Sequence, residues 1–388
     1  MLTNHFLSAD ERAELDLFRQ SLERFCDAEI EPHYRDWERA GQVPRTLFTQ
    51  MGAQGYLCAD VPEPYGGAGA SVHFSFAVTE VLARRGYGGL VGGVQVHNDV
   101  IPPYLLHCGT EAQRAHWLPR MARGEAIAAI GMTEPGAGSD LKALRTTARK
   151  DGDHYVINGS KIFISNGQNC HLIVLAAKTD PSAGAKGVSL FLVDTSTPGF
   201  SRGRNLDKVG QHAGDTSELF FEDMRVPLDA LLGGVEGQGF AQMMRELPRE
   251  RLIIGVQAVH GAQGALDVTQ RYVQERQAFG QAIGQFQNTR FTLAACATDI
   301  AAAQAFLNAS VDAYQRGDLS PEAASALKLH TSELMGRVAD QCLQLFGGYG
   351  YMAEYPIARF WTDARVLRIY GGTSEIMKEL VARGLLGR

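Results

Sequence analysis

The sequence lacks the features that mark a secreted, membrane-bound or nucleic-acid-binding protein. Its six cysteines are scattered along 388 residues with no Cys-x-x-Cys pair, which argues against a disulfide framework and a zinc site. No apolar run approaches the roughly 18 residues that span a bilayer, and the N-terminal segment lacks the basic and apolar regions of a secretory signal. A net charge of −6, without any run of Lys or Arg, offers no attraction for nucleic acid or an anionic membrane surface. We therefore expect a cytoplasmic globular protein that has no metal site and binds neither nucleic acid nor membrane.

A dinucleotide-binding glycine fingerprint is also missing. A nicotinamide enzyme would need Gly-x-Gly-x-x-Gly directly after a strand, with an acidic residue about twenty positions further on. The pairs Gly136-Ala-Gly138 and Gly237-Gln-Gly239 are each followed by the wrong spacing. No βαβ unit repeats along the chain, so we reject a Rossmann fold.

The composition and hydrophobic periodicity of the sequence change twice along the chain. Residues 1–127 are typical of helices, since Ser8 and Glu11 have the spacing of a capping box ahead of apolar residues at 3/4 spacing. Residues 128–235 hold short β-branched and aromatic runs separated by turn residues, which is typical of a compact antiparallel barrel or sandwich. Residues 236–388 carry long apolar seams, which indicate a bundle of long antiparallel helices. We predict an α+β protein with an N-terminal helical domain (1–127), a central antiparallel β-barrel or sandwich domain (128–235) and a C-terminal four-helix bundle (236–388).

Two local interpretations belong to this frame. We predict separate strands at 154–157 and 161–165, joined by an Asn158-Gly159 turn. His97 lies in the apolar segment 91–106, and we interpret it as a satisfied interior histidine rather than a catalyst.

One loop has the composition of a ligand site. Residues 132–141 (MTEPGAGSDL) place the hydroxyls of Thr133 and Ser139 among carboxylates and glycines around Pro135. Glycine allows backbone conformations and close ligand approach that other residues forbid, and proline prevents the segment from continuing a helix. Exposed backbone N–H groups beside short hydroxyls suit a planar, polar and partly anionic ligand, although Pro-Gly-x-Gly also fits an ordinary turn.

Several motifs, in order along the chain, resemble those of the acyl-CoA dehydrogenase family. They are VPEPYGGAGAS (61–71), GMTEPGAGSDL (131–141), NGSKIFISNG (158–167), ELFFEDMRVP (218–227), RQAFGQAIGQFQ (276–287), QLFGGYGY (344–351) and RIYGGTSEIMKELVAR (368–383). Together, within a helix–β–helix frame, they are far more specific than any one of them. The pairing of LPRERL (247–252) with IYGGTSEIMKEL (369–380) is most similar to the long-chain branch of the family, followed by the isovaleryl branch.

The resemblance implies FAD, bound between the β region and the C-terminal helices of a homotetramer. Phe163 and Ser165 would cover the isoalloxazine, and in a regular strand they share one face because side chains alternate. Arg276, Phe279 and Gln287 would reach the adenosine half of FAD in a neighbouring subunit, where the Arg276 fork suits pyrophosphate. The residues that match FAD contacts are Met132, Thr133, Gly138, Ser139, Phe163, Ile164, Ser165, Arg276, Phe279, Gln287, Gln344, Leu345, Phe346, Gly347, Gly348, Thr373, Ser374 and Glu375.

The family reaction is α,β-dehydrogenation of an acyl-CoA thioester, in which a carboxylate takes the α-proton and the β-hydrogen leaves as hydride to the flavin. In many relatives the base is a glutamate just before Gly-Thr near the C-terminus, where this sequence has Gly371. Glu250, in LPRERL, matches the position at which the long-chain and isovaleryl branches carry their base. We expect Glu250 to be the base rather than a structural carboxylate in a helix's first turn, because burial beside an acyl chain raises a carboxyl pKa towards neutrality. Glu375 is the alternative base.

The resemblance also implies a substrate site. Gly371 would offer its backbone N–H to the thioester carbonyl as an oxyanion donor. Because glycine removes a side chain beside the reacting carbons, we also expect room for branched or bulky acyl chains. The residues that match substrate contacts are Ser139, Ala185, Lys186, Ala241, Pro248, Arg249, Glu250, Arg251, Gly371 and Gly372, although Lys186 also fits a solvated loop charge.

The function implied is FAD-dependent conversion of a long-chain or branched acyl-CoA to the trans-2-enoyl-CoA in fatty-acid β-oxidation, with electrons passed to an electron-transfer flavoprotein. Two alternatives stay open. An acyl-CoA oxidase on the same framework would reoxidise the flavin with dioxygen. A helical interaction protein would have kept the fold without catalysis.

Overall fold

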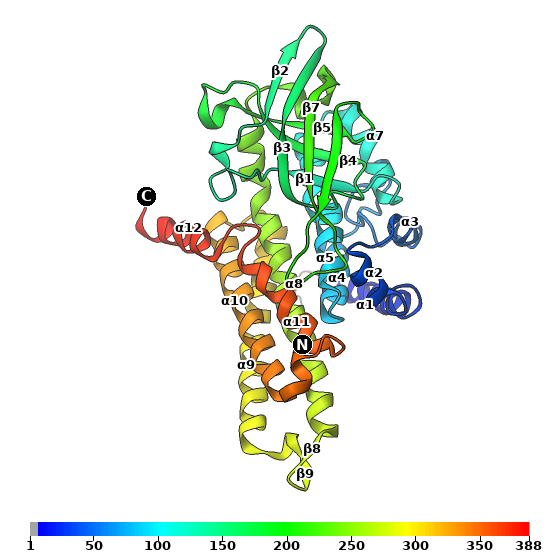
Figure 1. Cartoon of the computed structure of the whole chain (residues 1–388), viewed down its shortest axis with the longest axis vertical. Coiled ribbons are helices and arrows are strands. Elements are labelled where there is room, and N and C mark those ends of the chain that lie inside the picture. Colours follow the sequence, from blue (N-terminus) through cyan, green and yellow to red (C-terminus); the bar gives the residue numbers. More distant parts are fainter. Residues whose placement is uncertain (1–6, 388) are drawn as a thin grey trace.

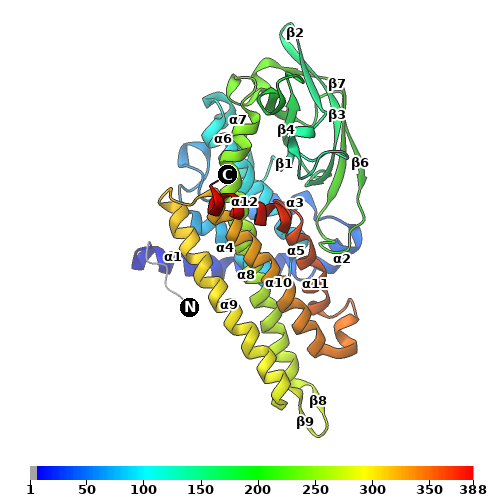
Figure 2. The same ribbon diagram turned by 90° about the vertical axis from the view of Figure 1, so that its left-hand side faces the viewer.

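A computed structural model describes residues 7–387 and shows a curled sheet at one end of the molecule and a bundle of long helices at the other (Figure 1). The outermost parts of the predicted first and last domains, residues 1–6 and 388, lie outside the described residues. The N-terminal helices lie beside the junction between sheet and bundle (Figure 2). The α+β class and the predicted order of helical, β and helical regions are confirmed.

The N-terminal helices begin with the predicted capping box. The Glu11 N–H donates to Ser8 Oγ at 3.1 Å, and the Ser8 N–H donates to the Glu11 carboxylate at 2.8 Å. These bonds satisfy backbone donors that the first helical turn leaves without partners. The helices of this region are α1 (Ala9–Phe25), α2 (Tyr34–Ala40), α3 (Arg45–Ala53), α4 (Val72–Arg84), α5 (Gly88–Gln95), α6 (Ile101–Cys108) and α7 (Glu111–Ala122).

A π-helical turn, Val96–Val100, connects α5 to α6 and carries His97. The His97 Nε2 donates to the Met121 carbonyl at 3.0 Å, and its Nδ1 accepts from the Ala128 N–H at 3.3 Å. Burial lowers the pKa of His97 to about 4, so the ring is neutral at physiological pH. The interpretation of His97 as a satisfied interior histidine is confirmed.

The central region forms a single curled sheet. Its strands are β1 (Ala128–Gly131), β2 (Thr147–Asp151), β3 (His154–Ser165), β4 (Leu172–Lys178), β5 (Val188–Asp194), β6 (Phe200–Asn205) and β7 (Thr216–Pro227). They follow the order β1-β4-β2-β3-β7-β6, and β5 pairs with β4. Most pairs are antiparallel as predicted, but β1 and β2 both run parallel to β4, with Ala128 opposite Leu172 and Thr147 opposite Lys178. The sheet is therefore mixed rather than purely antiparallel, because β1 and β4 are joined through β2 and β3 rather than by a hairpin.

The strands predicted at 154–157 and 161–165 are one continuous strand, β3. No turn forms at Asn158-Gly159: the backbone passes Gly159 at φ +152°, with a register shift against β7 between Ile157 and Gly159. A Cβ on Gly159 would stand 2.5 Å from Thr146 Oγ1, so glycine is required here by the close approach of the preceding segment.

The 37-residue helix α8 (Gly239–Glu275) runs from the sheet to the far end of the bundle and continues through Pro248 (Figure 2). Its buried residues, among them Leu252 and Val259, share one core with α9 and α10. Ser320 caps α10 by accepting from the Ala323 N–H at 3.1 Å, as the Ser-Pro pair predicts. The remaining elements are β8 (Gln277–Ala278), β9 (Gln281–Ala282), α9 (Gln287–Gln315), α10 (Pro321–Phe346), α11 (Pro356–Ala364) and α12 (Ser374–Leu386).

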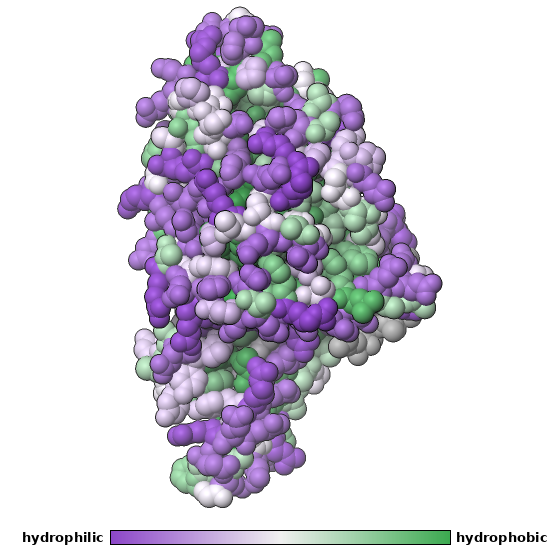
Figure 3. All heavy atoms as spheres, turned by 90° about the vertical axis from the view of Figure 1, so that its right-hand side faces the viewer, coloured by the Kyte–Doolittle hydropathy of each residue, from purple (hydrophilic) through white to green (hydrophobic). Residues whose placement is uncertain are grey.

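Hydrophobic side chains also reach the surface, and on the face shown in Figure 3 they gather about halfway along the molecule. Within residues 7–387, no helix combines the length and the apolarity of a membrane span.

Candidate active site

The loop 132–141 is held in shape by a buried ion pair. The Glu134 carboxylate accepts from Lys161 Nζ at 2.7 Å and from the Thr146 hydroxyl at 2.6 Å, and the Lys161 side chain is fully buried. Burial alone would raise the pKa of Glu134, but Lys161 and the hydrogen bonds outweigh it and lower that pKa. Glu134 therefore builds the loop from inside, while Gly136, Gly138 and Ser139 stay exposed.

Beside this loop, β3 presents Phe163 in a strained conformation. Phe163 has φ +62° and is 63% exposed, at a register shift between Lys161 and Ile164. The predicted sharing of a face by Phe163 and Ser165 assumed a regular strand, and the bulge removes that assumption. A backbone bond from the Ile162 N–H to the Thr133 carbonyl (2.9 Å) ties the strand to the loop. An exposed aromatic ring on strained backbone, next to a polar glycine loop, fits the flat ring of a flavin.

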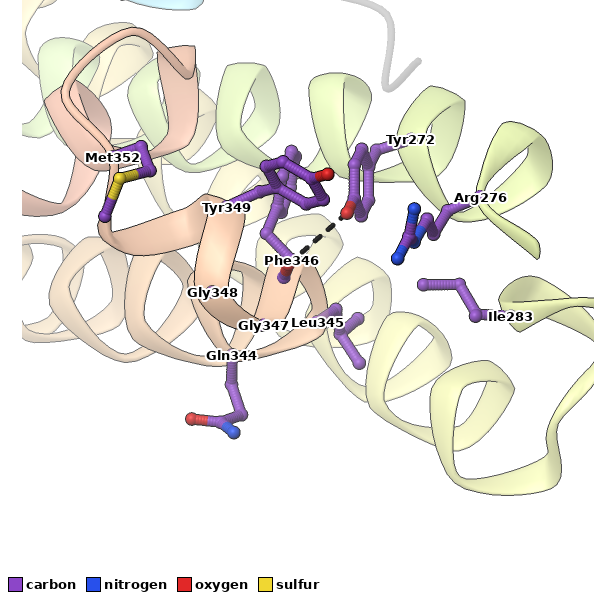
Figure 4. Close-up of a pocket in the computed structure, with 10 residues that line it drawn as sticks. All are labelled: Tyr272, Arg276, Ile283, Gln344, Leu345, Phe346, Gly347, Gly348, Tyr349 and Met352. Carbon is purple, nitrogen blue, oxygen red and sulfur yellow. Dashed lines mark hydrogen bonds between the residues drawn. The ribbon is translucent and has the colours of Figure 1, made fainter. Parts of the chain in front are cut away.

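A cavity of about 510 Å³ lies at the end of the bundle far from the sheet (Figures 1 and 4). Arg276 lies in its wall with the guanidinium 5.3 Å from the centre of the Tyr349 ring. Phe346 stacks on Tyr272 with ring centres 4.0 Å apart. A cation and aromatic rings around a glycine turn suit a nucleotide, whose phosphates and base need both. The predicted residues that line the cavity are Arg276, Gln344, Leu345, Phe346, Gly347 and Gly348.

The other two predicted adenosine contacts lie outside the lining of this cavity. Phe279 is 96% exposed at the β8–β9 turn, where φ is +51°, and Gln287 is the first residue of α9. Both belong to the same end of the bundle as Arg276. A bulky ring exposed on strained backbone is unusual at a surface turn and makes this turn a candidate contact surface.

Glu250 lies well inside α8, so it is not the first-turn carboxylate that formed the structural alternative. Its Oε1 accepts a hydrogen bond from the Tyr104 hydroxyl of α6 at 2.9 Å. Burial raises the pKa of Glu250 to about 7, and the Tyr104 bond and Arg251 offset only part of that rise. A partly buried carboxylate that titrates near neutrality has the properties of a general base.

The turn at Gly371 packs against Ile254 of α8, which lies one helical turn after Glu250. Gly371 and Gly372 have φ +63° and +100°, and Lys328 Nζ donates to the Gly372 carbonyl at 2.6 Å. A Cβ on Gly371 would stand 2.3 Å from Ile254 Cδ1. The prediction that Gly371 leaves open room is therefore wrong at this point, because the side chain of Ile254 occupies that space.

Glu375, the alternative base, lies exposed in the first turn of α12. Hydrogen bonds from its own N–H and from Thr373 lower the pKa of Glu375, which makes it a poorer proton acceptor than Glu250. Thr373 caps α12 by accepting from the Ile376 N–H at 3.3 Å, and the buried Ser374 donates to Glu333 at 2.6 Å.

The two arginines of LPRERL point into the protein. Arg249 is buried, with Nη2 2.7 Å from Asp60 and 3.1 Å from Asp99. Arg251 is also buried and donates to Ser325 Oγ at 3.2 Å. The guanidinium of Arg249 thus pairs with two carboxylates of the protein itself.

The remaining predicted substrate contacts lie where α8 begins. Ala185 and Lys186 belong to the loop between β4 and β5, which approaches Gly237 so closely that a Cβ there would stand 2.4 Å from the Lys186 carbonyl. Ala241 and Lys186 are exposed, whereas Pro248 is half-buried inside α8. The structure brings this group to the sheet end of α8, in the same half of the helix as Glu250.

Sequence reasoning missed several residues of these regions. Tyr104 is the hydroxyl-bearing side chain of a largely apolar helix, which alone does not indicate a contact with Glu250. Tyr272 lies in the last turn of α8, and its carbonyl accepts from the N–H of Arg276, the residue that follows the helix, at 2.9 Å. The other missed lining residues of the cavity are Ile283, Tyr349 and Met352.

Comparisons with known proteins cover the whole of this architecture. Residues 12–125, 129–224 and 237–386 match the family models for the N-terminal, middle and C-terminal domains of acyl-CoA dehydrogenase. The long-chain specific acyl-CoA dehydrogenase of Sus scrofa mitochondria is 44% identical over 377 residues, which are 96% of this chain and 87% of that protein.

Solved structures of acyl-CoA dehydrogenases have the same fold as this chain. An acyl-CoA dehydrogenase from Geobacillus kaustophilus superimposes with a TM-score of 0.94 at 44% identity, covering 99% of this chain and 100% of the other. A glutaryl-CoA dehydrogenase from Mycobacterium smegmatis in complex with FADH2 gives a TM-score of 0.91 at 30% identity, covering 100% and 97%.

Proposed function

The chain belongs to the acyl-CoA dehydrogenase family and is an FAD-dependent enzyme, and on this premise we propose that it dehydrogenates long-chain acyl-CoA thioesters with Glu250 as the base. The substrate class is supported by the long-chain enzyme of Sus scrofa and by the LPRERL motif that carries Glu250. An electron-transfer flavoprotein is the proposed electron acceptor. The cytoplasmic location expected from the sequence stays a prediction.

The observation that carries the proposal is the setting of Glu250. Tyr104 holds Oε1, and within residues 7–387 no hydrogen-bond donor occupies Oε2, which leaves that oxygen for a substrate α-proton. With a pKa of about 7, a large share of the Glu250 carboxyl is ionised at neutral pH and still basic enough to accept a proton. Gly371 would offer its N–H to the thioester carbonyl, where enolate charge develops as the proton leaves.

FAD would be held at its flavin end by loop 132–141, Phe163 and the start of α12. When bound, it accepts the substrate β-hydrogen as hydride. Its adenosine end would lie in the cavity around Arg276 of a neighbouring subunit. Within one subunit, that cavity and the loop 132–141 lie at opposite ends of the folded molecule (Figure 1). A site shared in this way requires an oligomer, and we propose the homotetramer.

The function is tested with an acyl-CoA panel that varies chain length and branching. When the purified enzyme is mixed with each acyl-CoA in the absence of oxygen, the flavin absorbance should bleach fastest with long straight acyl chains. Because Ile254 fills the space beside Gly371, we expect α-methyl-branched substrates to react more slowly. Failure to bleach with any acyl-CoA would support the non-catalytic interaction protein, and stoichiometric hydrogen peroxide on admission of air would support the oxidase.

A further inference from the structure

Two residues of α6 face two carboxylates of α8 in register. The Tyr104 hydroxyl lies 2.9 Å from Glu250 Oε1, and His107 Nδ1 lies 3.0 and 3.1 Å from the two carboxylate oxygens of Glu246. Tyr104 and His107 are three residues apart, whereas Glu246 and Glu250 are four apart, so each pair occupies one helix face. The two helices therefore present a matched ladder, Tyr104–Glu250 and His107–Glu246.

This ladder runs from the interior to solvent. Tyr104 is fully buried and the Glu246 side chain is 4% exposed, whereas the His107 side chain is 40% exposed. The nearly buried carboxylate of Glu246, one helical turn from Glu250, opposes ionisation of Glu250. His107 contacts that carboxylate at the surface end of the ladder, with Nδ1 3.0 Å from its nearer oxygen.

Other charged or titratable groups around the two carboxylates are few. On α8, Arg245 Nε lies 3.5 Å from Glu246, and Arg251 faces Ser325 and the Lys328 side of α10. On α6, Cys108 is the remaining titratable neighbour, and burial together with Glu246 raises the pKa of its thiol. Because Arg245 is 59% exposed, solvent screens it, which leaves His107 as the closest partner of Glu246.

We propose that Tyr104 is a positioning residue that fixes the orientation of the base, and that the His107–Glu246 pair adjusts how tightly Glu250 holds its proton. The inference rests on the proposed role of Glu250. The Tyr104 bond selects Oε2 as the reacting oxygen and stabilises the ionised carboxylate. The contact with His107 weakens the repulsion that the Glu246 charge exerts on Glu250, so loss of the His107 side chain makes Glu250 harder to ionise.

The test is the pH dependence of kcat/KM for a saturated-chain acyl-CoA in four variants. Tyr104→Phe and His107→Gln should move the acid limb to higher pH, by roughly one unit or less, because each removes a group that favours the ionised Glu250. Glu246→Gln should move it to lower pH, because it removes a like charge. Tyr104→Phe should also lower kcat more than it changes KM.

Tyr65→Phe is the matched control, since its hydroxyl donates to Glu111 at 2.7 Å on the surface and its profile should coincide with the wild type. Purely structural roles would lower activity in all variants without opposite shifts of the acid limb. If Tyr104→Phe does not fold, the opposite shifts of His107→Gln and Glu246→Gln still decide the matter.

Glu250→Gln distinguishes failure of this inference from failure of the proposed role of Glu250 as the base. An inactive Glu250→Gln together with superimposable profiles for the other variants would overturn this inference and leave the base assignment intact. An active Glu250→Gln would overturn both.

Discussion

Replacing Gly371 by alanine tests how tightly its turn is packed against Ile254 of α8. The added Cβ would stand 2.3 Å from Ile254 Cδ1, and the residue would have to keep φ +63°. Left-handed backbone costs about 1–2 kcal/mol for a non-glycine residue, and overpacking a buried site costs about 1–3 kcal/mol. We therefore expect Gly371→Ala to lower the free energy of unfolding by about 2–5 kcal/mol, the sum of these two costs.

The packing part of this cost is separable with a second substitution. Ile254→Ala alone should destabilise by about 2–5 kcal/mol, because Ile254 is only 7% exposed and its removal leaves a cavity. In the double variant the clash is gone, so the destabilisation should fall short of the sum by about 1–3 kcal/mol. Urea unfolding at fixed protein and FAD concentrations measures all three values.

Gly372→Ala is the matched control for this cycle. Its Cβ would stand 2.5 Å from Met377 Cε rather than from Ile254, so Ile254→Ala should give no such coupling with it. Additive effects of Gly371→Ala and Ile254→Ala would refute the reasoning. Ile254→Ala should also increase the relative rate with branched acyl-CoA substrates.

Other predictions follow from single interactions. Glu134→Gln leaves the buried Lys161 unpaired and should cost up to about 3–5 kcal/mol in urea unfolding, with loss of FAD, unless Lys161 sheds its proton; an unchanged midpoint would contradict the role of the pair. Arg276→Ala should reduce the FAD retained after gel filtration, whereas Arg39→Ala, an exposed arginine elsewhere, should not. In the folded protein the pKa of Glu250 is about 7, above its ordinary 4.5. Protonated Glu250 therefore stabilises the folded state fully below pH 4.5, and this contribution is lost as pH rises through 7. Glu250→Gln should therefore gain stability relative to the wild type between pH 5 and 8, and a constant difference in unfolding free energy would contradict this.

Long-range periodicity made most of the fold predictable from the sequence. The apolar seams of α8, α9 and α10 are long enough that tertiary contacts reinforce the local pattern. The capping box at Ser8 and the Ser320-Pro321 start of α10 depend only on neighbouring residues, so they were also predictable.

Features set by contacts between distant segments could not be predicted. Gly159 has the sequence signature of a turn, but the approach of Thr146 makes it part of a strand. Phe163 breaks the alternation of β3 through a bulge that only the register with β7 defines.

The residues of the candidate site divide in the same way into those that local sequence indicates and those that depend on distant contacts. Motif matching could propose Glu250 and the two candidate cofactor regions because the residues of each motif are contiguous in sequence. The glycine at position 371 indicated empty space, yet Ile254 from α8 fills it. Tyr104 is separated from Glu250 by 146 residues, and no local pattern marks their contact.

The assignment of Glu250 as the base is tested most directly by the anaerobic bleaching rate of Glu250→Gln after mixing with a long-chain acyl-CoA. With FAD content equal to that of the wild type, bleaching should be slower by at least ~10²–10⁴-fold, and Glu375→Gln should bleach at a rate near that of the wild type. Wild-type bleaching by Glu250→Gln, or loss of bleaching in Glu375→Gln with FAD still bound, would contradict the assignment.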